Sequence, residues 1–139
     1  MKINFSHKTE LRVRYGETDQ MGYCYYGNYA QYFEVGRVEA LRALGMSYKQ
    51  LEDKGVMLPV SDFSVKYKHP AKYDDALTIE TNITEIRGAR LAFDYTIHNE
   101  AGQLIATAHT TLVFVAKETM RPISPPTSFS SIIQPYEQN

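Results

Sequence analysis

Hydrophobic and polar residues alternate with a period of two over much of this chain, which predicts β-strands. The first alternating segment covers residues 9–15, with Leu11 and Val13 on one face and Arg12 on the other. Four more segments follow, over residues 63–69, 77–84, 91–98 and 104–116. The last segment is the longest and is apolar on both faces, which is typical of a central strand.

Between the first two strands the period changes to that of a helix. Five residues recur at spacings of three or four and would line one helix face: Tyr29, Phe33, Gly36, Ala40 and Leu44. Asn28 is a candidate N-cap, and Gly45 is a candidate C-terminal stop. Glycine in mid-helix costs about 1 kcal/mol relative to alanine, so Gly36 predicts the close approach of a neighbouring backbone.

Short connections complete the predicted elements. Ser47 and Gln50 have the spacing of a capping box, which predicts a short second helix that ends by Gly55. Residues 86–89 and 99–102 have the composition of tight turns. The last three strands are therefore predicted to form an antiparallel meander.

The order of these elements predicts an α+β protein. One helix with a single apolar face cannot bury itself, and one antiparallel sheet leaves an apolar face open. An antiparallel sheet wrapped around the long central helix solves both problems, which is the hotdog fold; another α+β sandwich is the alternative. We expect one domain over residues 1–126. Because Gly, Pro and Ser accumulate after Met120, residues 127–139 are expected to be an extended, weakly anchored tail.

Composition excludes several classes of protein. The formal net charge is −1, so no overall field attracts nucleic acid or an anionic membrane. No apolar run approaches the roughly 20 residues that span a bilayer, and charged residues interrupt the N-terminal segment where a signal peptide would lie. Cys24 is the single cysteine, so no disulfide can form within the chain. A cytoplasmic location is expected.

The loop before the long helix, residues 15–29, has the densest set of candidate functional residues. Tyr23, Tyr25, Tyr26 and Tyr29 crowd into seven positions and could form a pocket wall or a packed interface. Asp19 lies just upstream of the helix start, where unpaired amides could polarise a carbonyl and hold an oxyanion. A carboxylate there could be a general base or a nucleophile, although it could also be a simple turn residue.

This loop resembles that of the 4-hydroxybenzoyl-CoA thioesterase family. The likeness is carried by Glu17-Thr18-Asp19-x-x-Gly22-x-x-Tyr25-Tyr26-x-x-Tyr29, followed on the helix by Phe33-Glu34-x-x-Arg37. It extends over roughly residues 8 to 126. The resemblance implies a hotdog-fold enzyme that hydrolyses acyl-coenzyme A. It also implies no metal or redox cofactor and a homo-oligomer, either a dimer or a homotetramer.

The resemblance also assigns roles to individual residues. Asp19 falls on the family's catalytic aspartate, and Tyr26 on the position whose backbone amide polarises the thioester carbonyl. A tyrosine side chain is a poor base near neutral pH, so Asp19 would act alone as base or nucleophile. Arg87 and Arg90 flank Gly88 in a turn where the family often binds coenzyme A phosphates, although a solvated hairpin is the alternative. Tyr25 is a candidate substrate contact in the tyrosine-rich loop.

Other residues offer different chemistry. Glu34 could be a second catalytic carboxylate, or it could form an ion pair with Arg37 three residues later. Cys24 could be a nucleophile if a histidine lay beside it, but the sequence places none there: His69, His98 and His109 are all on predicted strands. The four histidines and one cysteine show no metal-ligand spacing, so no metal is expected.

Two other functions share the predicted fold. A hotdog dehydratase or hydratase would use a histidine with an acidic residue, and the loop contains no histidine. A non-catalytic acyl-CoA binding module is the other alternative, and the presence of Asp19 argues against it. The tyrosines would suit an aromatic or a short acyl group, but aromatic side chains line many pockets.

Overall fold

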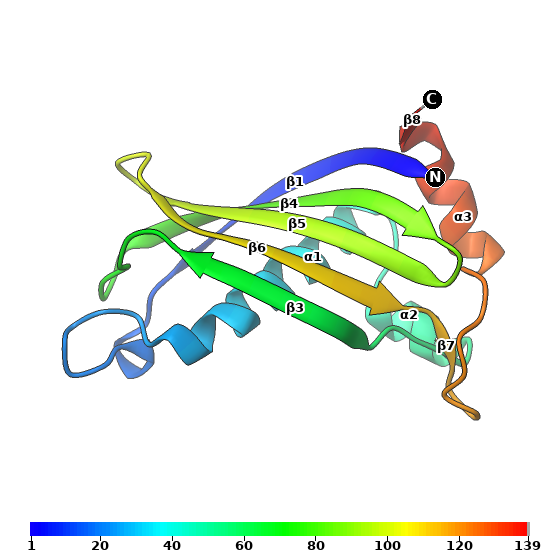
Figure 1. Ribbon diagram of the computed structural model, residues 1–139, viewed down its shortest axis with the longest axis horizontal. Coiled ribbons are helices and arrows are strands. Elements are labelled where there is room, and N and C mark those ends of the chain that lie inside the picture. The colour runs from blue at the N-terminus through cyan, green and yellow to red at the C-terminus, as the bar shows by residue number, and fades with distance from the viewer. Residues whose placement is uncertain (139) are drawn as a thin grey trace.

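A curved antiparallel sheet wraps around one long helix in the computed structural model, which describes residues 1–138 (Figure 1). The six strands follow the order β3-β6-β5-β4-β1-β8, and a second small sheet pairs β2 with β7. The predicted α+β class and hotdog arrangement are confirmed. The strands are β1 (Lys2–Arg12), β2 (Val56–Met57), β3 (Val60–Tyr67), β4 (Ala76–Arg87), β5 (Arg90–Asn99), β6 (Leu104–Val113), β7 (Val115–Ala116) and β8 (Glu137–Gln138).

The helices lie mainly on the concave face of the sheet and at its ends. They are α1 (Tyr29–Leu44), α2 (Tyr48–Asp53) and α3 (Thr127–Ile133), with 3-10 turns η1 (Tyr15–Glu17), η2 (Tyr26–Asn28) and η3 (Gln134–Tyr136). Both hydrogen bonds of the predicted capping box form at the start of α2. The predicted meander β4-β5-β6 is also confirmed, and β6 pairs on both sides, as expected of an interior strand. None of the helices within residues 1–138 combines the length and the hydrophobicity needed to cross a membrane.

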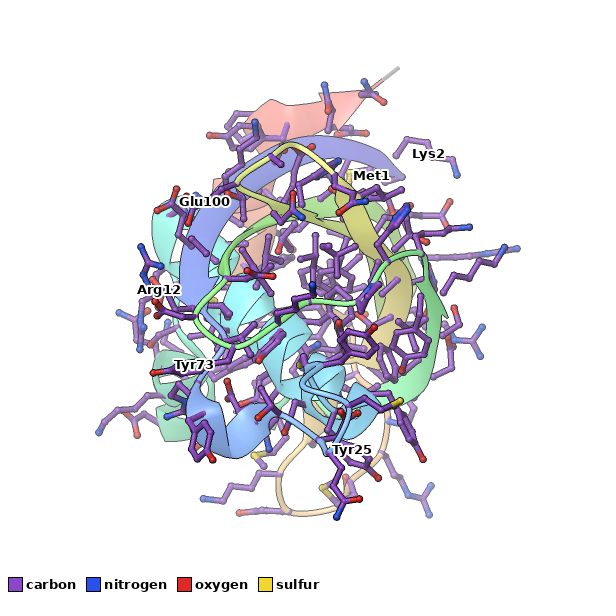
Figure 2. The ribbon with its side chains drawn as sticks, turned by 90° about the vertical axis from the view of Figure 1, so that its left-hand side faces the viewer. Met1, Lys2, Arg12, Tyr25, Tyr73 and Glu100 are labelled. Atoms are coloured by element: carbon purple, nitrogen blue, oxygen red, sulfur yellow. The ribbon has the colours of Figure 1, made fainter. Side chains whose placement is uncertain are left out.

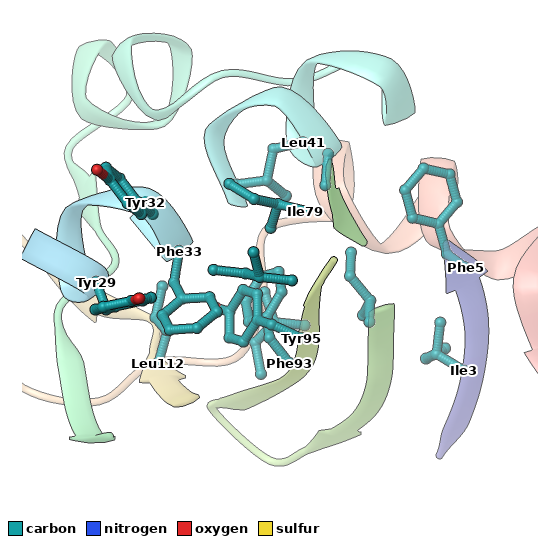
Figure 3. Close-up of a cluster of buried hydrophobic side chains, with 14 of the residues drawn as sticks. Ile3, Phe5, Tyr29, Tyr32, Phe33, Leu41, Ile79, Phe93, Tyr95 and Leu112 are labelled. Carbon is teal, nitrogen blue, oxygen red and sulfur yellow. The ribbon is translucent and has the colours of Figure 1, made fainter. Parts of the chain in front are cut away.

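Helix α1 packs on the sheet through its predicted apolar face. Phe33 is fully buried, and its ring centroid lies 4.9 Å from that of Tyr95 on β5 (Figure 3). A Cβ atom at Gly36 would lie 2.5 Å from Thr81 Oγ1 and 2.9 Å from Ile79 Cγ2. The close approach predicted at Gly36 is therefore real, but it comes from side chains of β4 rather than from a backbone.

The C-terminal end of α1 matches the prediction, and the N-terminal end does not. Gly45 stops the helix in the left-handed conformation, with φ of 111°, as predicted. The Asn28 side chain does not cap the helix; its amide instead donates to the Glu17 carbonyl over 2.8 Å. The prediction of a side-chain cap at Asn28 is wrong, because η2 precedes α1 and moves the first free amides upstream.

Strand β1 begins and ends earlier than predicted. It starts at Lys2 and ends at Arg12, because Ile3 and Phe5 face the core and the strand pairs with the long β4. Tyr15, predicted on the buried face, belongs to η1 and is 79% exposed. The chain therefore leaves the sheet before Tyr15 and turns toward the loop that precedes α1.

Strand β3 is an edge strand with little cover. The alternation over residues 63–69 predicted a strand, and two of its aromatic residues, Phe63 and Tyr67, are 40% and 48% exposed. Within the described chain β3 pairs with β6 alone, so its other edge and much of its apolar face are open. An open, apolar edge strand is a common place for another chain to bind.

The C-terminal segment is folded onto the domain. Phe129 and Ile133 of α3 are fully buried, and the Phe129 ring lies 5.2 Å from that of Phe114. Strand β8 then pairs with the start of β1. The expectation of an extended, weakly anchored tail is wrong, because these two apolar residues reach the core from one face of a short helix. The boundary after residue 126 stays a prediction.

Candidate active site

The loop between η1 and η2 is short, and backbone hydrogen bonds fix both of its ends. Thr18 and Cys24 form a β-bridge, and the Asp19 amide donates to the Tyr23 carbonyl over 2.8 Å. The second limb is fixed to the segment after β3, where the Cys24 amide donates to the Ala71 carbonyl over 2.7 Å. These bonds give the loop, residues 18–25, a defined shape, and we call it the Asp19 loop.

Asp19 is held by its own loop. Its Oδ1 accepts hydrogen bonds from the amides of Met21, at 2.9 Å, and Tyr23, at 3.2 Å. Within residues 1–138 the other oxygen, Oδ2, accepts none. One oxygen therefore fixes the carboxylate while the second is free to bind a water or to attack a carbonyl.

Two backbone amides at the start of the helical region are also free. The Tyr25 amide donates to the Glu17 carbonyl and the Asn28 amide to the Tyr25 carbonyl, but those of Tyr26 and Gly27 find no acceptor in the described chain. Unpaired amides at a helix start are suited to bind a developing oxyanion. A Cβ at Gly27 would lie 2.6 Å from the Tyr25 ring, so a side chain at this position would require the exposed Tyr25 ring to move.

Asp19 and Tyr26 line one pocket, with a volume of about 310 Å³. Two of its walls come from segments that the sequence did not connect to the site, the end of β3 and the residues that follow it. Tyr67 of β3 packs its ring against Tyr29, at a centroid distance of 5.2 Å, and against Tyr26, at 6.4 Å. The lining is Asp19, Met21, Tyr23, Cys24, Tyr26, Tyr29, Tyr67, Lys68, His69 and Pro70.

The structure places the other predicted contacts outside this pocket. Tyr25 lies at the surface, where its ring packs at 4.8 Å from that of Tyr26 (Figure 2). Arg87 and Arg90 face each other across the β4-β5 turn and line a separate pocket of about 460 Å³. Glu34 is exposed and lines a third pocket, of about 290 Å³, beside β3.

The predicted ion pair between Glu34 and Arg37 is not formed. Arg37 is buried, and its guanidinium donates instead to the hydroxyls of Tyr48, over 3.2 Å, and Tyr95, over 3.3 Å. Burial raises the pKa of Tyr95 to about 12, so this hydroxyl is neutral at physiological pH. Arg37 therefore ties α1 to α2 and β5 through neutral acceptors.

Cys24 lies closer to a histidine than the sequence indicated. Both Cys24 and His69 line the Asp19 pocket, because the segment after β3 folds against the Asp19 loop. Burial raises the pKa of the Cys24 thiol, which donates to the Tyr32 hydroxyl over 3.3 Å. A neutral, hydrogen-bonded thiol is a poor nucleophile. In the described part of the chain no three His, Cys, Asp or Glu side chains are grouped closely enough to hold a metal ion.

Glu17 is a site residue that sequence reasoning missed. Its carboxylate turns toward α1. There it accepts hydrogen bonds from Arg14 and from Tyr32. The spacing of Arg14 and Glu17, three residues apart at a short turn, was the available sequence signal.

The chain belongs to the thioesterase-like superfamily, whose family profile matches residues 13–133. It is 38% identical to YneP of Bacillus subtilis, over 94% of this chain and 95% of that protein. It is 34% identical to the acyl-CoA thioester hydrolase YbgC of Escherichia coli, over 92% and 93% of the two chains. The structure superimposes on that of a DHNA-CoA thioesterase from Staphylococcus aureus with a TM-score of 0.90, 34% identity, and coverage of 94% and 90%.

Proposed function

We propose that this protein is a cytoplasmic enzyme that hydrolyses the thioester of an acyl-coenzyme A to a free acid and coenzyme A. The observation that carries the proposal is one pocket lined by both Asp19 and Tyr26. Within residues 1–138 the Oδ2 of Asp19 accepts no hydrogen bond, and the amides of Tyr26 and the adjacent Gly27 donate none. Membership of the thioesterase-like superfamily supports the same reaction. A nucleophile must first add to the thioester carbonyl to form a tetrahedral intermediate. Hydrogen-bond donors at an oxyanion site stabilise this intermediate before the thiolate leaves.

In this proposal the thioester carbonyl oxygen binds at the amides of Tyr26 and Gly27. Asp19 Oδ2 then either removes a proton from an attacking water or attacks the carbonyl itself to give a mixed anhydride. In the first route the water oxygen forms the new C–O bond and the C–S bond breaks. In the second route water hydrolyses the anhydride, and the products are the same.

Release of free thiol from a panel of acyl-CoA esters tests the proposal directly. The panel should contain short, long and aromatic acyl groups, including 4-hydroxybenzoyl. The four tyrosines of the pocket and its volume of about 310 Å³ favour aromatic and short acyl groups. Absence of thiol release from every ester would contradict the enzymatic assignment, whereas binding without turnover would indicate an acyl-CoA binding module.

A dehydratase remains the second candidate because His69 shares the pocket with Asp19. Its Nδ1 lies 3.0 Å from the Leu104 carbonyl, an arrangement that favours a proton on Nδ1 and a free Nε2. Loss of water from a 3-hydroxyacyl-CoA, followed by the appearance of the enoyl product, would identify this activity. Thiol release without enoyl formation would exclude it.

Arg87 and Arg90 are proposed to bind coenzyme A phosphates. Replacement of both by alanine should raise KM for acyl-CoA roughly fivefold to tenfold and change kcat less, because a phosphate contact is equal in ground and transition states. Added salt should reduce the difference. Steady-state kinetics with acyl-pantetheine, which lacks the nucleotide, should show no such loss, and an equal loss there would contradict the assignment. Arg42→Ala, which removes an exposed arginine on α1, is the matched control.

We also propose that the protein forms a homo-oligomer, either a dimer or a tetramer. The support is the uncovered edge strand β3, where Val60, Phe63 and Tyr67 are each at least 40% exposed. Light scattering at micromolar concentration should give at least twice the chain mass of 15.9 kDa. A measured mass equal to that of one chain would contradict the proposal.

A further inference from the structure

The Glu17 carboxylate is almost completely enclosed by hydrogen-bond donors. It is 8% exposed, and its Oε1 accepts from the Arg14 amide over 2.8 Å and from the Tyr32 hydroxyl over 2.9 Å. Its Oε2 accepts from the Arg14 guanidinium over 3.0 Å. Arg14 belongs to the same turn and its side chain is largely exposed, so Tyr32 is the link that joins this turn to helix α1.

The backbone of Glu17 makes a second set of bonds. Its carbonyl accepts from the Tyr25 amide and from the Asn28 side chain, each over 2.8 Å. Asp19 lies between Glu17 and Tyr25 in the chain, and Tyr26 follows Tyr25. Glu17 therefore fixes the start of the Asp19 loop, its end, and the residues that carry the two free amides.

Tyr32 reaches the same loop from the helix. It is 3% exposed, donates to Glu17, and accepts from the Cys24 thiol over 3.3 Å. Burial raises the pKa of Tyr32 above its ordinary value, so the hydroxyl stays protonated. Burial would also raise the pKa of Glu17, but hydrogen bonds from Arg14 and Tyr32 lower it, so the carboxylate stays charged. A neutral donor to a buried charged acceptor is a strong bond.

We propose that the Glu17 carboxylate and the Tyr32 hydroxyl form a latch that positions Asp19 relative to the amides of Tyr26 and Gly27. Neither Glu17 nor Tyr32 is among the residues that line the Asp19 pocket, so both members are positioning residues. The inference rests on the proposed function, in which Asp19 and these amides act on one thioester. Misplacement of a reacting group by about 1 Å can reduce the rate by about 10²-fold.

Three substitutions separate the parts of the latch. Tyr32→Phe removes one oxygen atom and keeps the packed ring. Glu17→Gln keeps a carbonyl acceptor for the Arg14 amide and for Tyr32, and loses the negative charge and the two bonds from the exposed Arg14 guanidinium. Glu17→Ala removes every side-chain bond.

Enzyme kinetics on the full chain should then rank the variants. We expect Glu17→Ala to lower kcat by about 10- to 100-fold and Tyr32→Phe by about 3- to 10-fold, with KM within about twofold of the unchanged protein. Glu17→Gln should stay within about threefold in kcat. Glu39→Gln, which removes an exposed ion pair with Arg42 on the same helix, is the control and should not change kcat.

A double variant distinguishes positioning from general loss of structure. A latch that acts through Asp19 has little left to position in the Asp19→Asn background, so adding Tyr32→Phe or Glu17→Ala there should lower the residual rate by less than about twofold. Equal factors in both backgrounds would show that the substitutions act independently of Asp19, and would overturn the latch. If Glu17→Ala fails to fold, Tyr32→Phe alone gives the comparison.

Different experimental results would contradict the latch and the proposed function. If Asp19→Asn loses activity while folded Tyr32→Phe and Glu17→Ala keep the original kcat, the latch is wrong and the function stands. If Asp19→Asn itself keeps the original kcat, the role of Asp19 is wrong and the latch has nothing to position.

Discussion

Asp19→Asn should lower kcat by about 10²- to 10⁴-fold and leave KM almost unchanged. The asparagine carbonyl can take the place of Oδ1 and accept from the amides of Met21 and Tyr23, so the shape of the loop is kept. The free Oδ2 is then replaced by an amide group, which is neither a base nor a nucleophile. Steady-state kinetics with the best acyl-CoA of the panel measures the change.

The stability of this variant serves as its internal control. Because Asp19 lies in a partly exposed loop and its accepting oxygen is retained, the free energy of unfolding should change by no more than about 1 kcal/mol. Glu39→Gln is the matched control, since Glu39 pairs with Arg42 at the surface of α1 and is not among the residues that line the Asp19 pocket. A folded Asp19→Asn protein with the original rate would show that Asp19 is only a turn residue, and Glu34 would be the next carboxylate to test.

Phe129→Ala should be the most damaging substitution in the C-terminal segment. The side chain is fully buried against Phe114, and removal of a buried phenylalanine costs about 3–5 kcal/mol. For a domain of this size the Tm should fall by roughly 10–20 °C. Thermal unfolding followed by circular dichroism measures this shift.

Ser130→Ala on the same helix is the comparison for Phe129. Ser130 is exposed, so its replacement should change the free energy of unfolding by no more than about 0.5 kcal/mol. If Phe129→Ala unfolds at the same temperature as the unchanged protein, helix α3 is not docked, and the weakly anchored tail expected from composition would be correct after all.

Much of this fold could be predicted because its signals are local. The alternation in β4, β5 and β6 and the helical spacing of α1 repeat over ten or more residues each. The start of β1 and helix α3 were missed at the two ends of the chain, where the signals are short. Helix α3 has seven residues, and its two buried side chains are recognisable only once Phe114 is known to lie opposite.

The candidate site likewise contains residues with a local sequence signal and residues that only the tertiary structure brings together. Asp19 and Tyr26, which line one pocket, could be grouped from sequence because they belong to one contiguous motif beside a helix start. Tyr67 and His69 could not, because they reach the pocket only through the pairing of β3 with β6 and the fold of the next segment against the Asp19 loop. Glu17 carried the required chemistry in its sequence neighbourhood, but its partner Tyr32 depends on how the loop meets α1.

The tyrosines that line the Asp19 pocket should make ligand binding measurable by intrinsic fluorescence. Four of its eleven tyrosines line the pocket, and the chain contains no tryptophan. Tyrosine emission is ordinarily lost by energy transfer to tryptophan, and here no such acceptor exists. A ligand that fills the pocket changes the solvent around Tyr23, Tyr26, Tyr29 and Tyr67 together. Tyrosine fluorescence of the unlabelled protein should therefore change as acyl-CoA is titrated into an inactive Asp19→Asn variant.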